Sequence, residues 1–185
     1  MAFSRALTQW TLTVPWWLDA PSTMGFYGVL FGLFDNWLWR LPHLRLLGLI
    51  KVPDLTGRWT GYVTSSFDQH AERREVAVEI SQTWTRLAIR LRSKESRSNS
   101  IVASVLTESH AEGCQVVYKF RNEPIVGAEK EMEAHQGTAT LYVERDGAAL
   151  EGDYYSGRGR ANEGRIHLSR AAGSPPAAAV YEVRK

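Results

Sequence analysis

The sequence predicts an all-β fold: an eight-stranded antiparallel up-and-down β-barrel that follows a short aromatic-rich helical segment. Three observations favour it. After Gly57, apolar residues recur at every second position; these runs are short and separated by short polar connections; and no long helical pattern follows them. Short strands without crossover helices are typical of a closed barrel, whose interior holds side chains or one small ligand.

Length and charge limit the functional classes. At 185 residues and 44% hydrophobic composition, the chain can bury one substantial core, which favours one domain with an N-terminal appendage. The 22 basic and 20 acidic residues leave a formal charge of +2, so we expect no DNA or RNA partner, and any anion site must be local. Cys114 is the single cysteine, which excludes an internal disulfide; its position beside Val116 and Val117 favours a small buried thiol over a nucleophile.

Residues 1–52 have the composition of a membrane interface. Five of the seven tryptophans precede residue 40, and residues 6–18 and 20–34 carry no charge. The apolar run 24–39 is followed by Arg40, Arg45 and Lys51, as expected where a chain leaves a bilayer toward the cytoplasm. Neither run is a comfortable span, because Pro15 and Pro21 lie within the runs and Asp19 and Asp35 end them. Two interpretations stay open: membrane association, and a soluble helical lid packed on the barrel.

The junction at residues 53–61 separates this segment from the barrel. Pro53 and Asp54 end the apolar segment before them. Gly57 and Gly61 bracket Trp59, whose side chain can plug one end of a closed sheet. We therefore expect three regions: the N-terminal segment 1–52, a barrel domain 53–171, and a flexible tail 172–185.

The strands are predicted from their periodicity of two. In the first strand Trp59, Val63 and Phe67 share one parity, and in the second the shared positions are Val76, Val78, Ile80, Gln82 and Trp84. Leu87, Ile89 and Leu91 then take the odd positions, which requires a turn or bulge between Gln82 and Leu87. Later strands are predicted at residues 100–109, 115–122, 137–145, 150–156 and 164–170, with Asp146-Gly147 as a tight hairpin turn.

Residues 86–100 contain the most distinctive cluster of basic residues in the sequence. Its basic residues, set against the single acid Glu95, are Arg86, Arg90, Arg92, Lys94 and Arg97. Because Leu87, Ile89 and Leu91 point into the barrel, we expect Arg86, Arg90 and Arg92 to face solvent. Guanidinium and hydroxyl groups are good phosphate donors, so the candidate phosphate ligands, expected in a loop at the barrel mouth, are Ser96, Arg97 and Ser98.

A second set of residues suits the bases of a nucleotide. Aromatic planes stack on bases, and an asparagine offers a donor and an acceptor to a base edge. The candidates are Trp84, Tyr118 and Tyr154 for stacking and Asn122 for the base edge, with Arg158 as a further phosphate ligand. Each of the rings suits a barrel core equally well.

The sequence has no positive sign of catalysis, of a metal site or of a cofactor. Its histidines are scattered without metal spacing, and it has neither a G-x-S-x-G elbow nor a phosphate-binding glycine loop before a helix. We interpret His135 as a hydrogen-bonding residue at the start of a strand rather than as a base. The sequence therefore predicts a binding protein and not an enzyme.

The order of these motifs resembles the Cap15-type cyclic-nucleotide receptor family over residues 53–170. The motifs are Pro53-Asp54-Leu55-x-Gly57-x-Trp59-x-Gly61, Ser65-Ser66, Ile80-x-Gln82-x-Trp84, Ser96-x-Ser98-x-Ser100, Tyr118-x-x-x-Asn122-x-Pro124, His135-x-Gly137 and Leu150-x-Gly152-x-Tyr154-x-x-x-Arg158. The resemblance implies a barrel that senses a cyclic dinucleotide, made by a partner nucleotidyltransferase, in bacterial anti-phage (CBASS-type) immunity. It also implies ligand-driven homo-oligomerisation and disruption of the inner membrane, with the barrel facing the cytoplasm. The resemblance further implies two membrane segments, and the N-terminus departs from that pattern, because two full spans do not fit comfortably before Pro53.

Two other functions stay open. Gly57-x-Trp59 also resembles the start of a lipocalin, which would make the chain a lipocalin-like, membrane-tethered binder of an apolar small molecule. A barrel filled by its own side chains would instead be a structural adaptor. If the N-terminal segment is a soluble lid, the protein is cytoplasmic.

Overall fold

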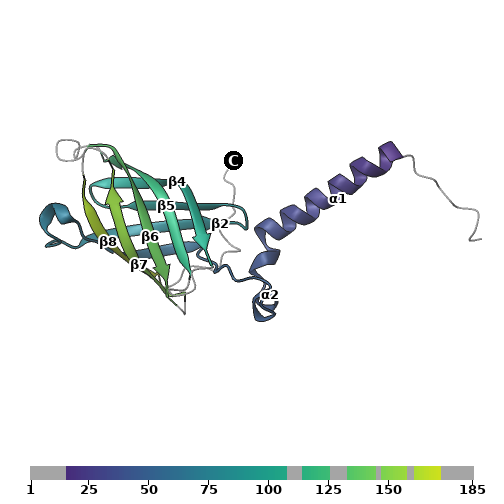
Figure 1. Ribbon diagram of the computed structural model, residues 1–185, viewed down its shortest axis with the longest axis horizontal. Helices are drawn as coiled ribbons and strands as arrows, with labels where there is room; N and C mark the ends of the chain where they lie inside the picture. Colours follow the sequence, from purple (N-terminus) through teal and green to yellow (C-terminus); the bar gives the residue numbers. More distant parts are fainter. Residues whose placement is uncertain (1–15, 108–113, 126–132, 145–146, 158–160, 172–185) are drawn as a thin grey trace, which may run out of the picture.

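The computed structural model describes residues 16–107, 114–125, 133–144, 147–157 and 161–171. Eight antiparallel strands form one closed barrel in sequence order, and β8 pairs back to β1 (Figure 1). The strands are β1 (Gly57–Val63), β2 (Arg74–Gln82), β3 (Leu87–Arg92), β4 (Ser96–Leu106), β5 (Gln115–Pro124), β6 (His135–Val143), β7 (Ala149–Ser156) and β8 (Glu163–Arg170). Helices α1 (Trp16–Asn36), η1 (Leu38–Arg40) and α2 (Pro42–Leu46) precede the barrel, and η2 (Ser66–Asp68) follows β1. The predicted all-β barrel is confirmed.

The predicted change of parity corresponds to the hairpin turn between β2 and β3. Along β2 the buried residues alternate with exposed ones and end at Gln82. The Thr83 N–H then donates to the Arg86 carbonyl at 2.8 Å, and β3 resumes with Ile89 inside the barrel. As expected, Arg86, Arg90 and Arg92 are exposed.

Several predicted strand limits are wrong, and the largest errors concern β4 and β1. β4 begins at Ser96 and not at Ser100, because Ser96 and Ser98 pair with Pro124 and Asn122 and extend the ladder toward the barrel mouth. β1 ends at Val63, so Phe67 lies outside it. The reason is local: the Phe67 N–H donates to the Ser65 hydroxyl at 3.2 Å, and this bond caps η2 in place of a strand.

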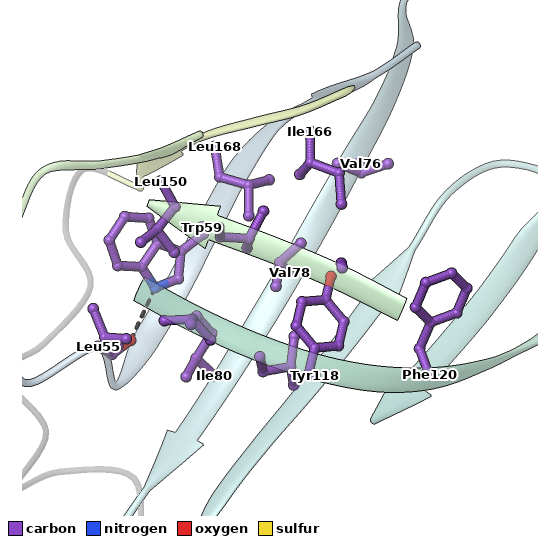
Figure 2. Close-up of a cluster of buried hydrophobic side chains, with 14 residues drawn as sticks. Leu55, Trp59, Val76, Val78, Ile80, Tyr118, Phe120, Leu150, Ile166 and Leu168 are labelled. Atoms are coloured by element: carbon purple, nitrogen blue, oxygen red, sulfur yellow. Dashed lines mark hydrogen bonds between the residues drawn. The ribbon is translucent and has the colours of Figure 1, made fainter. Parts of the chain in front are cut away.

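Trp59 closes one end of the barrel. Its side chain is fully buried among Leu55, Ile80 and Leu150, and its indole N–H donates to the Leu55 carbonyl at 2.9 Å (Figure 2). The Arg170 guanidinium lies 4.4 Å from the centre of the indole ring and donates to the carbonyls of Thr56 and Asp54 at 2.8 and 2.9 Å. The junction 53–61 is therefore built into the barrel as the predicted plug.

A buried glutamine fixes the chain before β1. Gln82 is 2% exposed; its side-chain carbonyl accepts from the Leu55 N–H at 2.8 Å, and its amide donates to the Pro53 carbonyl at 3.1 Å. The Arg40 guanidinium donates to the backbone carbonyl of Gln82 and forms an ion pair with the Asp54 carboxylate at 3.5 Å. These bonds connect the helical segment to the closed end of the barrel.

The turn between β2 and β3 holds the end of α1. Trp84 lies in this turn and not in a strand; its ring meets Phe34 edge-on at 5.4 Å and the fully buried Trp39 at 6.1 Å. The Asp35 carboxylate accepts from the N–H and the hydroxyl of Thr85, each at 2.8 Å. Burial acts to raise the pKa of Asp35, but these hydrogen bonds and the charge of Arg86 outweigh it and lower the pKa.

Beyond this contact α1 extends away from the barrel (Figure 1). Along it and the following turns many large apolar side chains are exposed, among them Met24, Phe26, Tyr27, Val29, Trp37, Leu46, Leu47 and Leu49. Among the described residues, no helix combines the length and the apolar character that crossing a bilayer requires. The predicted tail 172–185 lies outside the described residues.

Candidate ligand site at the open end of the barrel

A cavity of about 610 Å³ opens at the end of the barrel opposite α1. All eight strands contribute to its wall, and its rim is formed by η2 and the turn between β3 and β4. Because Trp59 and Leu55 fill the other end, the barrel has one mouth and one closed end. A volume of this order is typical of small-molecule sites.

The upper tier of the cavity is polar. Ser98 pairs with Asn122 across β4 and β5, and Asn122 pairs with His135 across β5 and β6, so the three lie side by side on the inner face. Ser98 and Asn122 are 8% and 7% exposed. Ser96 lies at the rim, where its hydroxyl is 3.3 Å from the Ser93 hydroxyl. Buried hydroxyl and amide groups of this kind present donors and acceptors to a ligand.

The lower tier is aromatic. Tyr118 pairs with Ala139 and Ala139 with Tyr154, and Phe120 lies between the two tyrosines with ring centres 6.1 and 6.3 Å away. Tyr118 is 4% exposed, and burial raises the pKa of its phenol, so the hydroxyl stays neutral. Figure 2 shows Tyr118 and Phe120 at the opposite end of the apolar cluster from Trp59.

Two glycines make room for these rings. A Cβ at Gly137 would lie 2.4 Å from the Phe120 ring, and one at Gly164 would lie 2.5 Å from the Tyr154 ring. Tyr154 in turn donates its hydroxyl to the Thr64 carbonyl at 3.2 Å. The rings are therefore held in place by close approach of the backbone, as in a preorganised site.

Among the residues that the structure describes, Arg74 is the one arginine that lines the cavity, and carboxylates surround it. The Arg74 guanidinium forms ion pairs with Asp68 at 2.9 Å, Glu72 at 3.2 Å and Glu95 at 4.0 Å. Of these, Glu72 and Glu95 line the cavity with Arg74. The mouth of the cavity thus holds the Arg74 guanidinium, whose positive charge is balanced by these carboxylates.

Five of the eight predicted ligand residues line this cavity: Ser96, Ser98, Tyr118, Asn122 and Tyr154. The structure places the other two described ones elsewhere. Trp84 packs on α1 at the closed end, because the strand ends before it. Arg97 alternates with Ser96 and Ser98, so it faces outward and pairs with Glu123 at 3.4 Å. Arg158 lies outside the described residues.

Among the residues of the cavity wall that sequence reasoning missed are Arg74, Phe120 and Ser156. The signal was present in strand parity. Arg74 shares the parity of Val76 and Val78, Phe120 that of Tyr118, and Ser156 that of Tyr154. Each of the three therefore belongs to the inward-facing set of its strand, and parity alone assigns it to the interior of the barrel.

The other candidate reactive groups have ordinary surroundings. His135 begins β6, and its Nδ1 lies 2.9 Å from the Glu133 carbonyl, which fits its interpretation as a hydrogen-bonding residue at a strand start. Cys114 is half-buried, and burial raises the pKa of its thiol, which disfavours the nucleophilic thiolate. Within the described part of the chain, no cluster of three metal-ligating side chains is present.

Comparison with known proteins agrees with this geometry. The family model for the Cap15 cyclic dinucleotide receptor domain matches residues 50–170. A CD-NTase-associated protein 15 from Yersinia aleksiciae is 34% identical over 151 residues, which are 80% of this chain and 69% of that protein. A CD-NTase-associated protein 15 from Staphylococcus schleiferi is 28% identical over 124 residues, 67% of this chain and 64% of that protein. The barrel, its one-ended cavity and these matches together show that the chain belongs to the Cap15 cyclic dinucleotide receptor family.

Proposed function

We propose that this protein is a receptor that binds a cyclic dinucleotide in the cavity at the open end of its barrel. The observation that carries the proposal is the layered wall of that cavity, in which buried serine and asparagine side chains lie above three contacting aromatic rings. A cyclic dinucleotide has both matching parts, a polar ring with two phosphates and two flat bases.

Each tier suits one part of such a ligand. The Ser96 and Ser98 hydroxyls are donors for phosphate oxygens, and Asn122 offers a donor and an acceptor to a base edge. Tyr118 and Tyr154 offer ring faces for stacking. Arg74 supplies the charge: an incoming phosphate would compete with Asp68, Glu72 and Glu95 for its guanidinium.

The same wall disfavours a purely apolar ligand. Filling the cavity with a lipid would cover the Ser98 and Ser156 hydroxyls without giving them new partners. Each covered polar group without a partner costs about 1–3 kcal/mol. The lipocalin-like function is therefore the weaker of the two.

We further propose that the protein is a non-enzymatic effector of CBASS-type anti-phage immunity, in which ligand binding drives self-assembly and the N-terminal segment disrupts the inner membrane. The relatives' name associates them with a CD-NTase, the source of such a messenger. The exposed apolar side chains of α1 and its neighbours support the membrane step, because a soluble surface rarely leaves so many uncovered. In this scheme residues 1–52 are the output segment and 53–171 the sensor.

Thermal denaturation of the purified protein with cyclic dinucleotides carrying adenine, guanine or uracil bases tests the binding step. A ligand present at 100 times its Kd stabilises the folded state by about 2.7 kcal/mol, which raises the melting temperature by on the order of 5–10 °C. A fatty acid and a linear dinucleotide serve as controls. Stabilisation by the fatty acid alone would transfer the assignment to an apolar ligand.

Asn122→Ala is expected to weaken binding of the active cyclic dinucleotide about 5- to 100-fold, because one buried hydrogen-bonding partner of the ligand is removed. Asn99→Ala is the matched control, since Asn99 lies on the same ladder but faces outward. Isothermal titration calorimetry measures both constants. Equal affinities in the two variants would remove Asn122 from the site.

A further inference from the structure

The two neighbours of β4 cover very different lengths of it. Its ladder with β5 runs to the pair Leu106–Gln115, whereas its ladder with β3 ends at Asn99–Arg90. A bulge lies between Ser100 and Val102, and next to it the Ile89 N–H donates to the Ser100 side-chain hydroxyl. Past this point β5 is the only strand of the described residues with which β4 forms a ladder.

The uncovered half of β4 therefore presents a strand edge. Alternate residues between Val102 and Leu106 direct backbone N–H and C=O groups away from β5, and no described residue forms a ladder with that side. A row of free backbone groups is a template for pairing with another strand.

This half of β4 also lacks the usual protection of an edge. Residues 98–107 contain neither a charged residue nor a proline. The outward side chains Ile101, Val102 and Leu106 are 56%, 62% and 46% exposed. Charged residues and prolines normally keep exposed edges from pairing, and an uncharged run rich in β-branched residues favours pairing.

We propose that the edge of β4 from Val102 to Leu106 pairs, antiparallel, with the same edge of a second copy of this chain. The inference rests on the proposed self-assembly and names the surface that carries it. Two strands related by a two-fold axis present identical donors, acceptors and apolar side chains to each other, and here no like charges meet across the axis.

The position of the edge agrees with this role. β4 runs from the cavity mouth at Ser96 to the closed end, where the junction with α1 lies. The free edge is at the closed end, so pairing there leaves both mouths open and brings two N-terminal segments close together.

Val102→Lys tests the interface, because a lysine on an edge opposes strand pairing and the exposed side chain is not needed for the core. The full-length protein is titrated with the cyclic dinucleotides named above, and its mass is followed by light scattering alongside its thermal shift. Thr60→Lys is the matched control: Thr60 is exposed, but its strand is paired on both sides, to Ala77 and Ser169.

We expect the parent protein and Thr60→Lys to at least double in mass on ligand binding, and Val102→Lys to keep its ligand-free mass with an unchanged thermal shift. Assembly of Val102→Lys like the parent, or ligand binding without any gain in mass, would overturn the inference. Absence of a thermal shift in the parent would instead overturn the proposed function.

Cross-linking in the presence of the cyclic dinucleotide that gives the largest thermal shift tests the geometry of the pair. Single cysteines are placed by Val102→Cys, Ser104→Cys and Leu106→Cys in a Cys114→Ser background and oxidised alone and in mixtures. Antiparallel pairing about a two-fold axis has one register, so only the combinations that belong to that register should form the disulfide efficiently; an axis at Ser104, for example, joins position 104 to itself and position 102 to 106. Cross-links in no combination, or in all of them equally, contradict the pairing.

Discussion

Replacing Trp59 with alanine is expected to destabilise the barrel by about 3–5 kcal/mol, the usual cost of removing a fully buried large side chain. The indole is 0% exposed, closes one end of the barrel and donates to the Leu55 carbonyl. Chemical denaturation measures the loss, and the melting temperature should fall by on the order of 10–20 °C.

Trp84→Ala is the matched control for this change. Trp84 is 39% exposed and packs on Phe34 and Trp39 at the edge of the barrel, so its removal is expected to cost less than about 2 kcal/mol. Similar losses for the two variants would mean that Trp59 does not act as the plug of the barrel.

Arg74→Ala is expected to reduce affinity for a cyclic dinucleotide about 100-fold. The substitution removes the cation of the cavity wall and leaves Glu72 and Glu95 to repel an incoming phosphate. The loss should shrink at high salt, because repulsion between partly exposed charges is screened. Calorimetric titration at two salt concentrations measures both effects.

Arg90→Ala removes the same charge from the outer face of β3 and serves as the control. This variant should bind the cyclic dinucleotide with an affinity within about twofold of that of the parent protein, because solvent and salt screen a charge on the outer face from a ligand inside the cavity. If Arg90→Ala weakened binding as much as Arg74→Ala does, the ligand would respond to the net charge of the barrel and not to the cavity cation.

Much of the fold follows from periodicity in the sequence. The alternation of Val76, Val78 and Ile80 and the shift to Leu87 and Ile89 predict two paired strands and the turn between them, and the structure has both. Strand ends were harder to predict. Ser96 and Ser98 read as loop residues by composition, but their backbones pair with Pro124 and Asn122, and long-range pairing overrides local preference.

The candidate site shows a similar division. Tyr118 and Asn122 share a strand parity, so their common position in the cavity follows from the sequence. Trp84 and Arg97 are related to these two only by a suitable residue type. The parity of Trp84 continues that of Ile80 and Gln82, which hides the end of the strand at Gln82. Turns of an up-and-down barrel alternate between its two ends, so the turn after Gln82 lies at the same end as the start of β1, and Trp84 lies at the closed end.

The placement of mouth and helices at opposite ends of the barrel has a consequence for how a tethered receptor meets its messenger. If the apolar leader engages a lipid surface, the ligand entrance is directed toward bulk solvent. A messenger diffusing from a distant synthase would then reach the entrance unobstructed, and neighbouring receptors crowded on the same surface would not shield it. Ligand binding and the membrane step would then take place at opposite ends of the barrel. The strands between the two ends would transmit the effect of binding.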